Sequence, residues 1–299
     1  MLIILNAGAR GMAGNPCKTR VKIAELFRTA GTHPQIIVAQ GNEVAAIARR
    51  AVAGNEETIV AGGGDGTVGT VAGEIAATGT KLGVLPLGTF NHFARDLGVT
   101  LHLEGAVHVV VDNHAVRVDV AEVNGRTFVN NSGLGIYPHI VALREAKQQH
   151  WLKRGKWWAL VIATLQVARR LQFLDVRIIG RGKELVRKTS FIFIGNNEYQ
   201  MTGFQIGRRS RLNAGLLSLY VTHRTGWPGL LRLATAALFR RLNQAKNFEK
   251  YSVEEVFIES PSSPVLVATD GEVNWMESPL HYRVRPNALR VIAPDHRTN

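Results

Sequence analysis

The sequence predicts an α/β domain, with a parallel sheet covered by helices, followed by an antiparallel, β-rich domain. Two observations support this prediction. Strand-like and helix-like apolar patterns alternate over residues 1–110, and from residue 115 onward hairpin turns and two-residue alternation dominate. A length of 299 residues accommodates two domains of ordinary size.

The first part of the chain alternates strands with helices. Strands are expected at Leu2–Leu5, Gln35–Val38, Thr58–Ala61 and Lys81–Leu85. Helices are expected between them, at Lys18–Ala30, Asn42–Ala53 and Val68–Thr78, where apolar residues recur at helical spacing. Strands separated by helices in this way pair in parallel, and their ligands bind beyond the carboxyl ends of the strands.

The second part reads as an antiparallel domain. Val116–Val123 alternates, Asn124-Gly125 favours a type I′ turn, and Arg126–Asn130 is expected to pair back. Further strands are expected at Asp175–Ile179, Ser190–Ile194, Leu216–Val221, Val253–Ser260 and Pro264–Ala268, with helices at Lys156–Leu171 and Leu230–Asn243. We therefore expect one domain over residues 1–115 and a second over residues 116–299.

The clearest functional signal is the glycine-rich segment Ala61-Gly-Gly-Gly-Asp-Gly-Thr-Val68. It follows a predicted strand and precedes a predicted helix, so its N–H groups and the helix N-terminus form a cradle for phosphate. A carboxylate there would repel a bare phosphate. Asp65 is therefore expected to face a metal ion or a hydroxyl that loses its proton, which indicates phosphoryl transfer.

Two other interpretations of this segment stay open. Residues 64–69 satisfy the dinucleotide pattern G-x-G-x-x-G, but that fold expects an acidic residue about 20 positions further on, and Lys81–Arg95 contains none. A plain glycine-rich turn is the second interpretation. A Walker P-loop is excluded, because the string G-x-x-x-x-G-K-[ST] does not occur.

Positive charge is concentrated in the second part of the chain. Residues 1–115 hold nine basic and nine acidic side chains, whereas residues 116–299 hold 27 and 14 and account for the net charge of +13. Over residues 144–250 the numbers are 21 and 5. Such a field attracts an anionic membrane surface or nucleic acid. A solvated basic surface without a partner is the alternative.

The composition favours a cytoplasmic protein. A single cysteine, Cys17, excludes an internal disulfide, as is usual in a reducing cytosol. No apolar run reaches the roughly 18 residues of a membrane span. The initial Met-Leu-Ile-Ile-Leu run is short and lacks the basic residues that begin a signal peptide.

Five motifs follow one another along almost the whole chain. They are Gly63-Gly-Asp-Gly-Thr67, Pro86-Leu-Gly-Thr-Phe-Asn-His-Phe-Ala-Arg95, Phe128-Val-Asn-Asn-Ser-Gly-Leu-Gly135, Asp270-Gly-Glu272 and Arg285-Pro-Asn-Ala-Leu-Arg-Val-Ile-Ala-Pro294. In this order they resemble the diacylglycerol-kinase catalytic family, which includes bacterial lipid kinases and sphingosine kinases. The first motif alone is shared with NAD kinases and phosphofructokinases, so the order carries the specificity.

The resemblance implies an N-terminal α/β nucleotide domain, with helices on both faces of a parallel sheet, and an antiparallel β-sandwich C-terminal domain. The tail, residues 280–299, is expected to pack back on the first domain. The implied activity is transfer of the γ-phosphate of ATP, with Mg²⁺, to a diacylglycerol-like or sphingoid-like lipid hydroxyl. This would occur in the cytoplasm, at the inner membrane face.

A lipid substrate and an anionic membrane surface are the expected partners, without nucleic acid, and a homodimer is left open. Two alternatives remain. One is a kinase of a soluble substrate, such as an NAD kinase. The other is a protein that binds a nucleotide or nucleic acid without catalysis.

The resemblance also assigns roles to residues. The amides of Gly63, Gly64 and Gly66 would hold the ATP phosphates, and the Thr67 hydroxyl would add a bond. Asp65 would act in catalysis by binding Mg²⁺. The complete set expected to bind the nucleotide is Asn6, Gly63, Gly64, Asp65, Gly66, Thr67, Thr89 and Asn91.

Glu272 resembles the general base that the family is proposed to use on the lipid hydroxyl. Asp270 lies two residues earlier and is expected to act in catalysis and to bind metal with Asp65. On an extended strand Asp270 and Glu272 would share one face, and a cation would relieve their repulsion. An ordinary turn is the alternative explanation of Asp270-Gly-Glu272.

Three positions depart from the family pattern. The usual Asn-Pro-x-Ser-Gly reads Asn6-Ala-Gly-Ala-Arg10, which weakens the role of Asn6. His92 replaces the carboxylate of the usual Asn-Asp-Phe, which either alters metal coordination or serves to cap a helix. Ala214 replaces the aspartate with which related bacterial enzymes hold a structural Mg²⁺, so that site is not expected.

The basic region also contains tryptophans. Aromatic side chains among basic ones suit a membrane interface, with a buried core position as the alternative. The residues concerned are Trp151, Trp157 and Trp158 among Lys153, Arg154, Lys156, Arg169 and Arg170. We expect residues 144–250 to bind anionic membranes reversibly.

Overall fold

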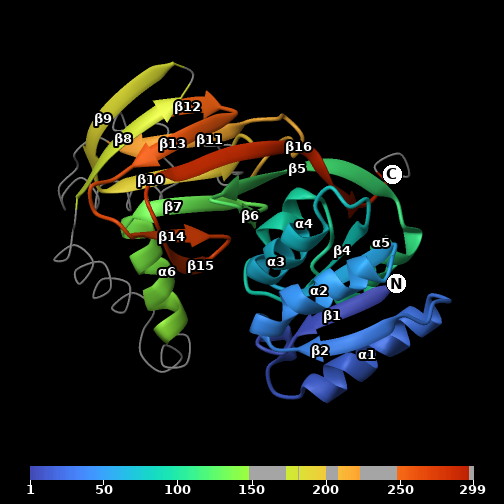
Figure 1. Ribbon diagram of the computed structural model, residues 1–299. Helices are drawn as coiled ribbons and strands as arrows, with labels where there is room; N and C mark the ends of the chain where they lie inside the picture. Colours follow the sequence, from blue (N-terminus) through green and yellow to red (C-terminus); the bar gives the residue numbers. More distant parts are fainter. Residues whose placement is uncertain (148–172, 181, 200–207, 223–247, 296–299) are drawn as a thin grey trace. The chain divides into compact units, whose positions relative to one another are not determined.

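The computed structural model describes residues 1–147, 173–180, 182–199, 208–222 and 248–295 (Figure 1). The chain divides into two compact units. Unit 1 comprises Met1–Asn130, Ser210–Gly215 and Val284–Asn299, and unit 2 comprises Asn131–Arg209 and Leu216–Arg283. Among the described residues, no helix is both long enough and apolar enough to cross a membrane.

The sheet of unit 1 is parallel along its strand order β2-β1-β3-β4-β16. Its strands are β1 (Leu2–Asn6), β2 (Gln35–Ala39), β3 (Thr58–Gly63), β4 (Lys81–Pro86) and the second part of β16 (Leu280–Ile292). All six residues of β3 are buried, as expected for a strand covered on both faces.

Helices cover both faces of this sheet (Figure 1), as the sequence predicted. On one side α1 packs with α5, and on the other α2 packs with α3. The elements are 3₁₀ helix η1 (Arg10–Met12), α1 (Pro16–Thr29), 3₁₀ helix η2 (Gly41–Glu43), α2 (Val44–Ala53), α3 (Asp65–Ile75), the short α4 (His92–Asp96) and α5 (Leu103–Asp112). Helix α1 begins after Asn15, whose side chain accepts the N–H of Lys18, with Pro16 at its first position.

The hairpin of β5 (Ala115–Val123) and β6 (Arg126–Phe128) belongs to unit 1. Its turn has positive φ at Asn124 (47°) and Gly125 (81°), as a type I′ turn requires. Strand β5 pairs with β16, and α3 packs against β6. The division therefore falls after Asn130, which corrects the boundary expected at residue 115. The strand pattern becomes antiparallel there, but the hairpin still joins the first core.

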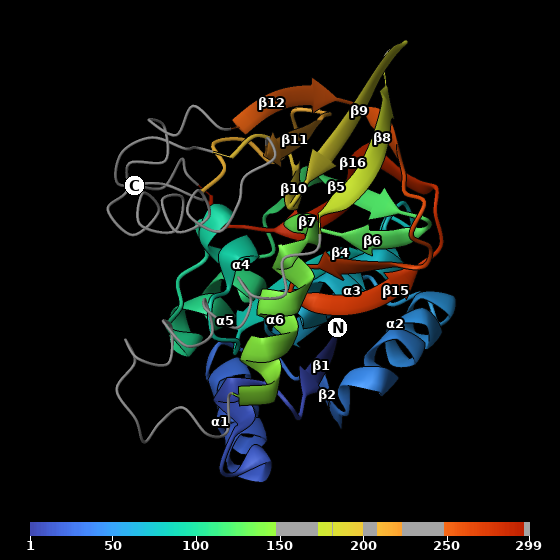
Figure 2. The ribbon, with the colours of Figure 1, turned by 90° about the vertical axis from the view of Figure 1, so that its left-hand side faces the viewer.

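Unit 2 is antiparallel, as predicted. One sheet has the order β12-β11-β10-β7-β14-β15, and in the other β9, β8, β13 and the first part of β16 are neighbours. The strands are β7 (Asn131–Gly135), β8 (Leu174–Gly180), β9 (Lys183–Thr189), β10 (Phe191–Asn196), β11 (Leu217–Thr222), β12 (Phe248–Val253), β13 (Glu255–Glu259), β14 (Val265–Thr269) and β15 (Glu272–Met276). Helix α6 (Ile136–Lys147) packs along β7, β14 and β15 (Figures 1 and 2).

Several elements were not predicted. These are helices α4, α5 and α6 and strands β7, β9, β12, β15 and β16. The two helices expected at 156–171 and 230–243 lie outside the described residues. The strands that were predicted begin and end within about three residues of their expected limits, a usual margin for sequence patterns.

Candidate active site

The glycine segment of unit 1 connects the end of β3 to the start of α3. A Cβ atom on Gly88 would lie 2.3 Å from the Cα of Gly64, and one on Gly63 would lie 2.4 Å from the Thr67 Oγ1. The loop after β3 and the loop after β4 therefore pack backbone against backbone. Glycine is required at position 88 because no side chain fits between the two loops, and at position 63 because the Thr67 side chain occupies the space.

The accessible part of this segment is the N-terminus of α3. Gly64, Asp65 and Gly66 are half-buried, whereas Thr67 is buried. The N–H of Val68 donates to the Gly64 carbonyl at 3.0 Å, so the amides of residues 65–67 precede the first intrahelical bond. Amides that have no intrahelical acceptor, at the positive end of an 11-residue helix, suit a phosphate.

Asn6 and Thr67, both expected to bind nucleotide, lie together. The Asn6 Nδ2 donates to the Thr67 Oγ1 at 2.9 Å, and the Asn6 Oδ1 accepts the N–H of Gly8 at 2.9 Å. The first strand thus supports the glycine loop although the family's usual Asn-Pro-x-Ser-Gly is not kept. The Thr67 hydroxyl is oriented by this bond.

Asp65 is surrounded by hydrogen-bond donors. Its Oδ2 accepts the N–H of His92 at 3.1 Å, and its Oδ1 accepts the N–H of Phe93 at 3.0 Å and the Nδ2 of Asn130 at 3.0 Å. The carboxylate therefore links α3, the start of α4 and the residue before β7. Asp65 therefore has a structural role in the phosphate cradle, as the acceptor that connects these segments, and the sequence did not indicate this role.

Asn91 serves the fold of its own loop. Its Oδ1 accepts the N–H of Gly88 at 2.9 Å, and its Nδ2 donates to the carbonyls of Pro86 and Gly88 at 3.3 and 3.1 Å. Its φ of 51° is left-handed, a conformation that asparagine tolerates. Thr89 is exposed, so the hydroxyl of Thr89 is the more accessible of the two groups expected to line the nucleotide site.

His92 lies at the start of α4. Its backbone N–H binds Asp65, and its ring stacks on Phe90 at 5.5 Å with 7° between the planes. The Asp65 carboxylate therefore satisfies an N-terminal amide of α4 by accepting the His92 backbone N–H. The His92 imidazole is not the group that makes this bond.

In unit 2, Asp270 and Gly271 form the two-residue turn between β14 and β15. Their φ angles are 49° and 89°, and Thr269 pairs with Glu272 across the hairpin. This corrects the expectation that Asp270 and Glu272 share one face of an extended strand. Only Glu272 is in the strand, because the Asp-Gly pair adopts the positive φ angles of a type I′ turn.

The Asp270 carboxylate also binds within the fold. Its Oδ1 accepts the N–H of Asn131 at 3.1 Å, and its N–H donates to the Asn131 carbonyl at 2.9 Å. The Asn131 side chain accepts the Tyr137 hydroxyl at 3.2 Å. Nearby, burial raises the pKa of Tyr282, whose hydroxyl lies 3.0 Å from the Ser132 Oγ. Glu272 is half-buried at the start of β15, beside this network.

The expected site residues therefore form two groups, one in each unit. Asn6, Asp65, Thr67 and Asn91 lie around the loops of unit 1, and Asp270 and Glu272 lie on one hairpin of unit 2. Within the described ranges, no cluster of three or more His, Cys, Asp or Glu side chains is arranged to hold a metal ion.

A single carboxylate still suits Mg²⁺ in this setting. Magnesium is commonly held by one or two carboxylates together with substrate phosphates. Asp65 stands at the helix end where a phosphate would bind, so its carboxylate fits that pattern. Asp270 belongs to unit 2, where its Oδ1 accepts the N–H of Asn131.

Asp119 is an acidic residue whose importance the sequence did not indicate. It is 1% exposed, and its two oxygens accept the N–H groups of Gly215 at 2.7 Å and Asn287 at 2.8 Å. A buried carboxylate in this part of unit 1 thus joins two distant segments. The clue was an acidic residue among the alternating valines of β5, where a buried charge needs partners.

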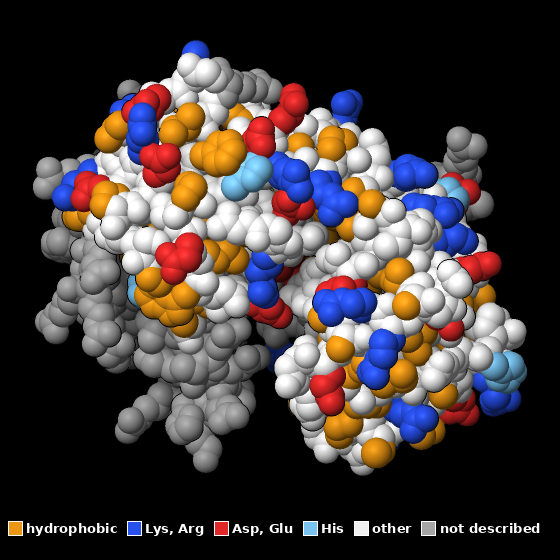
Figure 3. Space-filling model, viewed as in Figure 1, with side chains coloured by type: hydrophobic (Ala, Val, Ile, Leu, Met, Phe, Trp, Pro, Cys, Tyr) orange, Lys and Arg blue, Asp and Glu red, His pale blue; other side chains and the backbone are white. Residues whose placement is uncertain are grey.

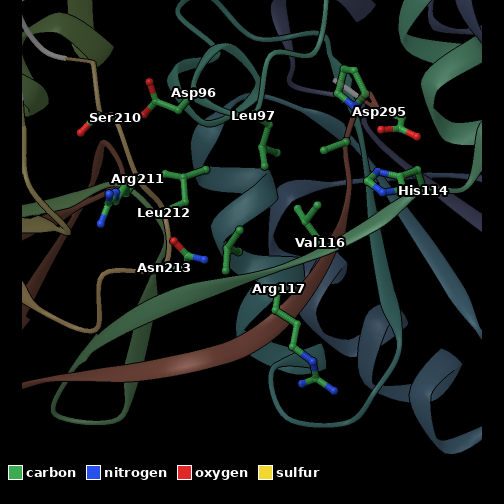
Figure 4. A pocket seen from close by; sticks show the side chains of 13 residues that line it. Asp96, Leu97, His114, Val116, Arg117, Ser210, Arg211, Leu212, Asn213 and Asp295 are labelled. Atoms are coloured by element: carbon green, nitrogen blue, oxygen red, sulfur yellow. The ribbon is translucent and has the colours of Figure 1, made fainter. Parts of the chain in front are cut away.

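Unit 1 also contains an open cavity of about 640 Å³ (Figure 4). It lies between the end of α4, the start of β5, residues 210–213 and residues 293–295. Its lining includes Asp96, Arg117, Arg211 and Asp295, with Leu97 and Val116. None of the expected nucleotide-binding residues lines it, so this cavity is separate from the glycine loop.

Comparison with known proteins agrees with this architecture. Residues 1–123 match the family model described as the diacylglycerol kinase catalytic domain, and residues 140–293 match the YegS C-terminal NAD kinase beta sandwich-like domain. Diacylglycerol kinases of Staphylococcus aureus strains JH9 and Newman are each 28% identical over 193 residues, which is 64% of this chain. The match spans 60% of the length of these curated relatives.

Solved structures show the same fold. A diacylglycerol kinase from Bacillus anthracis str. Sterne superposes with a TM-score of 0.68 at 19% identity. A second structure from that organism gives 0.74 at 22% identity, and in both cases 98% of this chain and 96% of the other are covered. The chain belongs to the diacylglycerol kinase catalytic-domain family, with a YegS-type C-terminal domain.

Proposed function

We propose that the protein is an ATP-dependent lipid kinase, which transfers the γ-phosphate of ATP to a lipid hydroxyl. The observation that carries this proposal is the N-terminus of α3, where the half-buried residues Gly64, Asp65 and Gly66 lie at the positive end of the helix. Family membership supports it. The curated relatives are named diacylglycerol kinases, so diacylglycerol is the first acceptor to test and a sphingoid base the second.

Phosphoryl transfer depends mainly on positioning and electrostatics. The amides of residues 65–67 bind phosphate oxygens, and Thr67, oriented by Asn6, adds a hydroxyl donor. Glu272 accepts the proton of the lipid hydroxyl on a carboxylate oxygen as that hydroxyl attacks the γ-phosphorus of ATP. The bond from the γ-phosphorus to the bridging oxygen breaks, and ADP leaves. Mg²⁺ would be held by Asp65 together with the nucleotide, and it would supply positive charge that offsets the charge of the phosphates.

Transfer of labelled phosphate tests this function. The protein is incubated with γ-labelled ATP and Mg²⁺, with vesicles containing diacylglycerol, vesicles containing a sphingoid base, or NAD without lipid. We expect label in a lipid product. Label in NAD would support a kinase of a soluble substrate instead, and ATP binding without transfer to any acceptor would support a non-catalytic nucleotide binder.

We further propose that the basic region, residues 144–250, docks the protein on the cytoplasmic membrane surface. Much of this region, including Trp151, Trp157 and Trp158, lies outside the described residues. Over the described residues of the face in Figure 3, basic and acidic side chains are interspersed. The proposal therefore rests on the excess of 21 basic over 5 acidic side chains in residues 144–250.

Vesicle binding is expected to depend on lipid charge and on salt. Surface attraction is screened within about 8 Å at physiological ionic strength, so binding to anionic vesicles should weaken as salt rises. Changing Lys153, Arg154 and Lys156 together to Gln should weaken it further in co-sedimentation.

The matched control changes Lys18, Arg20 and Lys22, which lie exposed on α1, to Gln and should bind like the wild type. Equal, salt-insensitive binding to neutral and anionic vesicles would contradict the electrostatic proposal. Salt-sensitive binding to DNA but not to vesicles would indicate a nucleic-acid partner instead.

A further inference from the structure

The motif Phe128-Val-Asn-Asn-Ser-Gly-Leu-Gly135 has no role in the function proposed so far, although the structure gives its third residue a distinctive setting. Asn130 is 1% exposed. Its neighbours Phe128 and Val129 are fully buried, so the backbone at this position is fixed by the core of unit 1. From there the Asn130 Nδ2 donates to the Asp65 Oδ1 at 3.0 Å.

This contact changes the hydrogen-bonding capacity of the two carboxylate oxygens. An ionised carboxylate offers about four lone-pair directions, two on each oxygen. On Asp65, Oδ1 accepts two donors, Phe93 N–H and Asn130 Nδ2, whereas Oδ2 accepts one, the His92 N–H. Among the contacts described, Oδ1 is therefore saturated, and Oδ2 keeps one direction for a further partner.

The two kinds of donor on Asp65 differ in origin. The backbone amides of His92 and Phe93 would be present with any side chains there, because they belong to the first turn of α4. Asn130 contributes a side chain instead. Without the Asn130 amide, Oδ1 would regain a lone pair, and the two oxygens would become equivalent toward a cation.

We propose that Asn130 is a positioning residue of the nucleotide site, which orients the Asp65 carboxylate so that Oδ2 is the oxygen that receives Mg²⁺-ATP. This deepens the proposed function and rests on it for the role of Asp65. Asn130 itself does not touch substrate. It acts through Asp65 by a charge-assisted hydrogen bond, a strong class of contact when buried.

Two substitutions test the proposal in the full-length protein. Asn130→Leu removes the donor and keeps four side-chain heavy atoms with the same branching at Cγ. Asn130→Asp replaces the donor with a second carboxylate about 3 Å from Asp65, and two carboxylates this close share one proton. The matched control is Asn124→Asp, which adds the same charge on the exposed turn of the same hairpin.

Mg²⁺-ATP affinity by calorimetry is the first measurement, since it needs no lipid acceptor. At pH 8 both Asn130 variants should bind Mg²⁺-ATP about 10- to 100-fold more weakly than the wild type, the range for a lost hydrogen bond to a charged group. Asn130→Asp should then recover as the pH falls, because protonation of the pair raises affinity by restoring an O–H donor to Asp65. Asn130→Leu should show no such recovery, and Asn124→Asp should follow the wild type.

Turnover with the lipid acceptor should show the same pH difference. Three results would overturn the proposal. The first is that both Asn130 variants bind Mg²⁺-ATP with an affinity within about twofold of that of Asn124→Asp. The second is that Asn130→Asp binds Mg²⁺-ATP more tightly than the wild type at pH 8, and the third is that both Asn130 variants are unfolded at 25 °C. The last would show that the amide serves the fold itself. Failure of the wild type to phosphorylate any acceptor would count against the kinase function alone, because the affinity measurement decides the role of Asn130.

Discussion

Asp65→Asn is expected to lower phosphate transfer by roughly 10²–10³-fold, the usual cost of losing one charged group that stabilises the transition state. Asp65 stands at the N-terminus of α3, where its charge would order Mg²⁺ beside the phosphates. Initial rates at saturating ATP and lipid, over a series of Mg²⁺ concentrations, measure the effect.

The contacts of Asp65 predict a second consequence. Asparagine at this position would direct an NH₂ group at one of the donors on α4 or at Asn130, since only one of its two side-chain ends accepts. The free energy of unfolding should therefore fall by about 1–3 kcal/mol. Thermal or urea unfolding measures this loss.

The control for this prediction is Asp112→Asn, which removes an exposed carboxylate at the end of α5 in the same unit. It should resemble the wild type in both rate and stability. Near-normal phosphate transfer by Asp65→Asn with Mg²⁺ present would contradict the catalytic role. A stability loss with normal transfer would reduce Asp65 to a structural link between α3 and α4.

The sequence predicted the parts of the fold that depend on local patterns. The apolar runs of β1 and β3 and the Asn124-Gly125 turn were recognisable because strand burial and positive φ angles restrict which residues can occur. The domain boundary was not recognisable. Whether the β5–β6 hairpin packs on the first core or the second depends on long-range contacts, such as that of α3 with β6.

The same limit explains the site. The glycine loop was found because it is contiguous, but the partners of Asp65 come from residues 27, 28 and 65 positions away. An alternating pattern of apolar and polar residues cannot indicate which distant amide donates a hydrogen bond to a carboxylate. For the Asp270-Gly pair the local signal was present in the sequence, since Asp-Gly favours a turn with positive φ angles. The prediction of an extended strand there was wrong because it did not use that signal.

Glu272→Gln is expected to lower turnover by about 10²–10⁴-fold, the usual contribution of a general base. Glu272 follows the Asp270-Gly271 turn as the first residue of β15, so its backbone is held by pairing with Thr269 and the amide should fit without disturbing the hairpin. ATP affinity should persist, because the base acts on the lipid hydroxyl and not on the nucleotide. Rates and ATP binding are measured beside Glu254→Gln, an exposed glutamate of the same unit that should behave as the wild type. Loss of ATP affinity with unchanged turnover of the bound nucleotide would instead make Glu272 a nucleotide ligand.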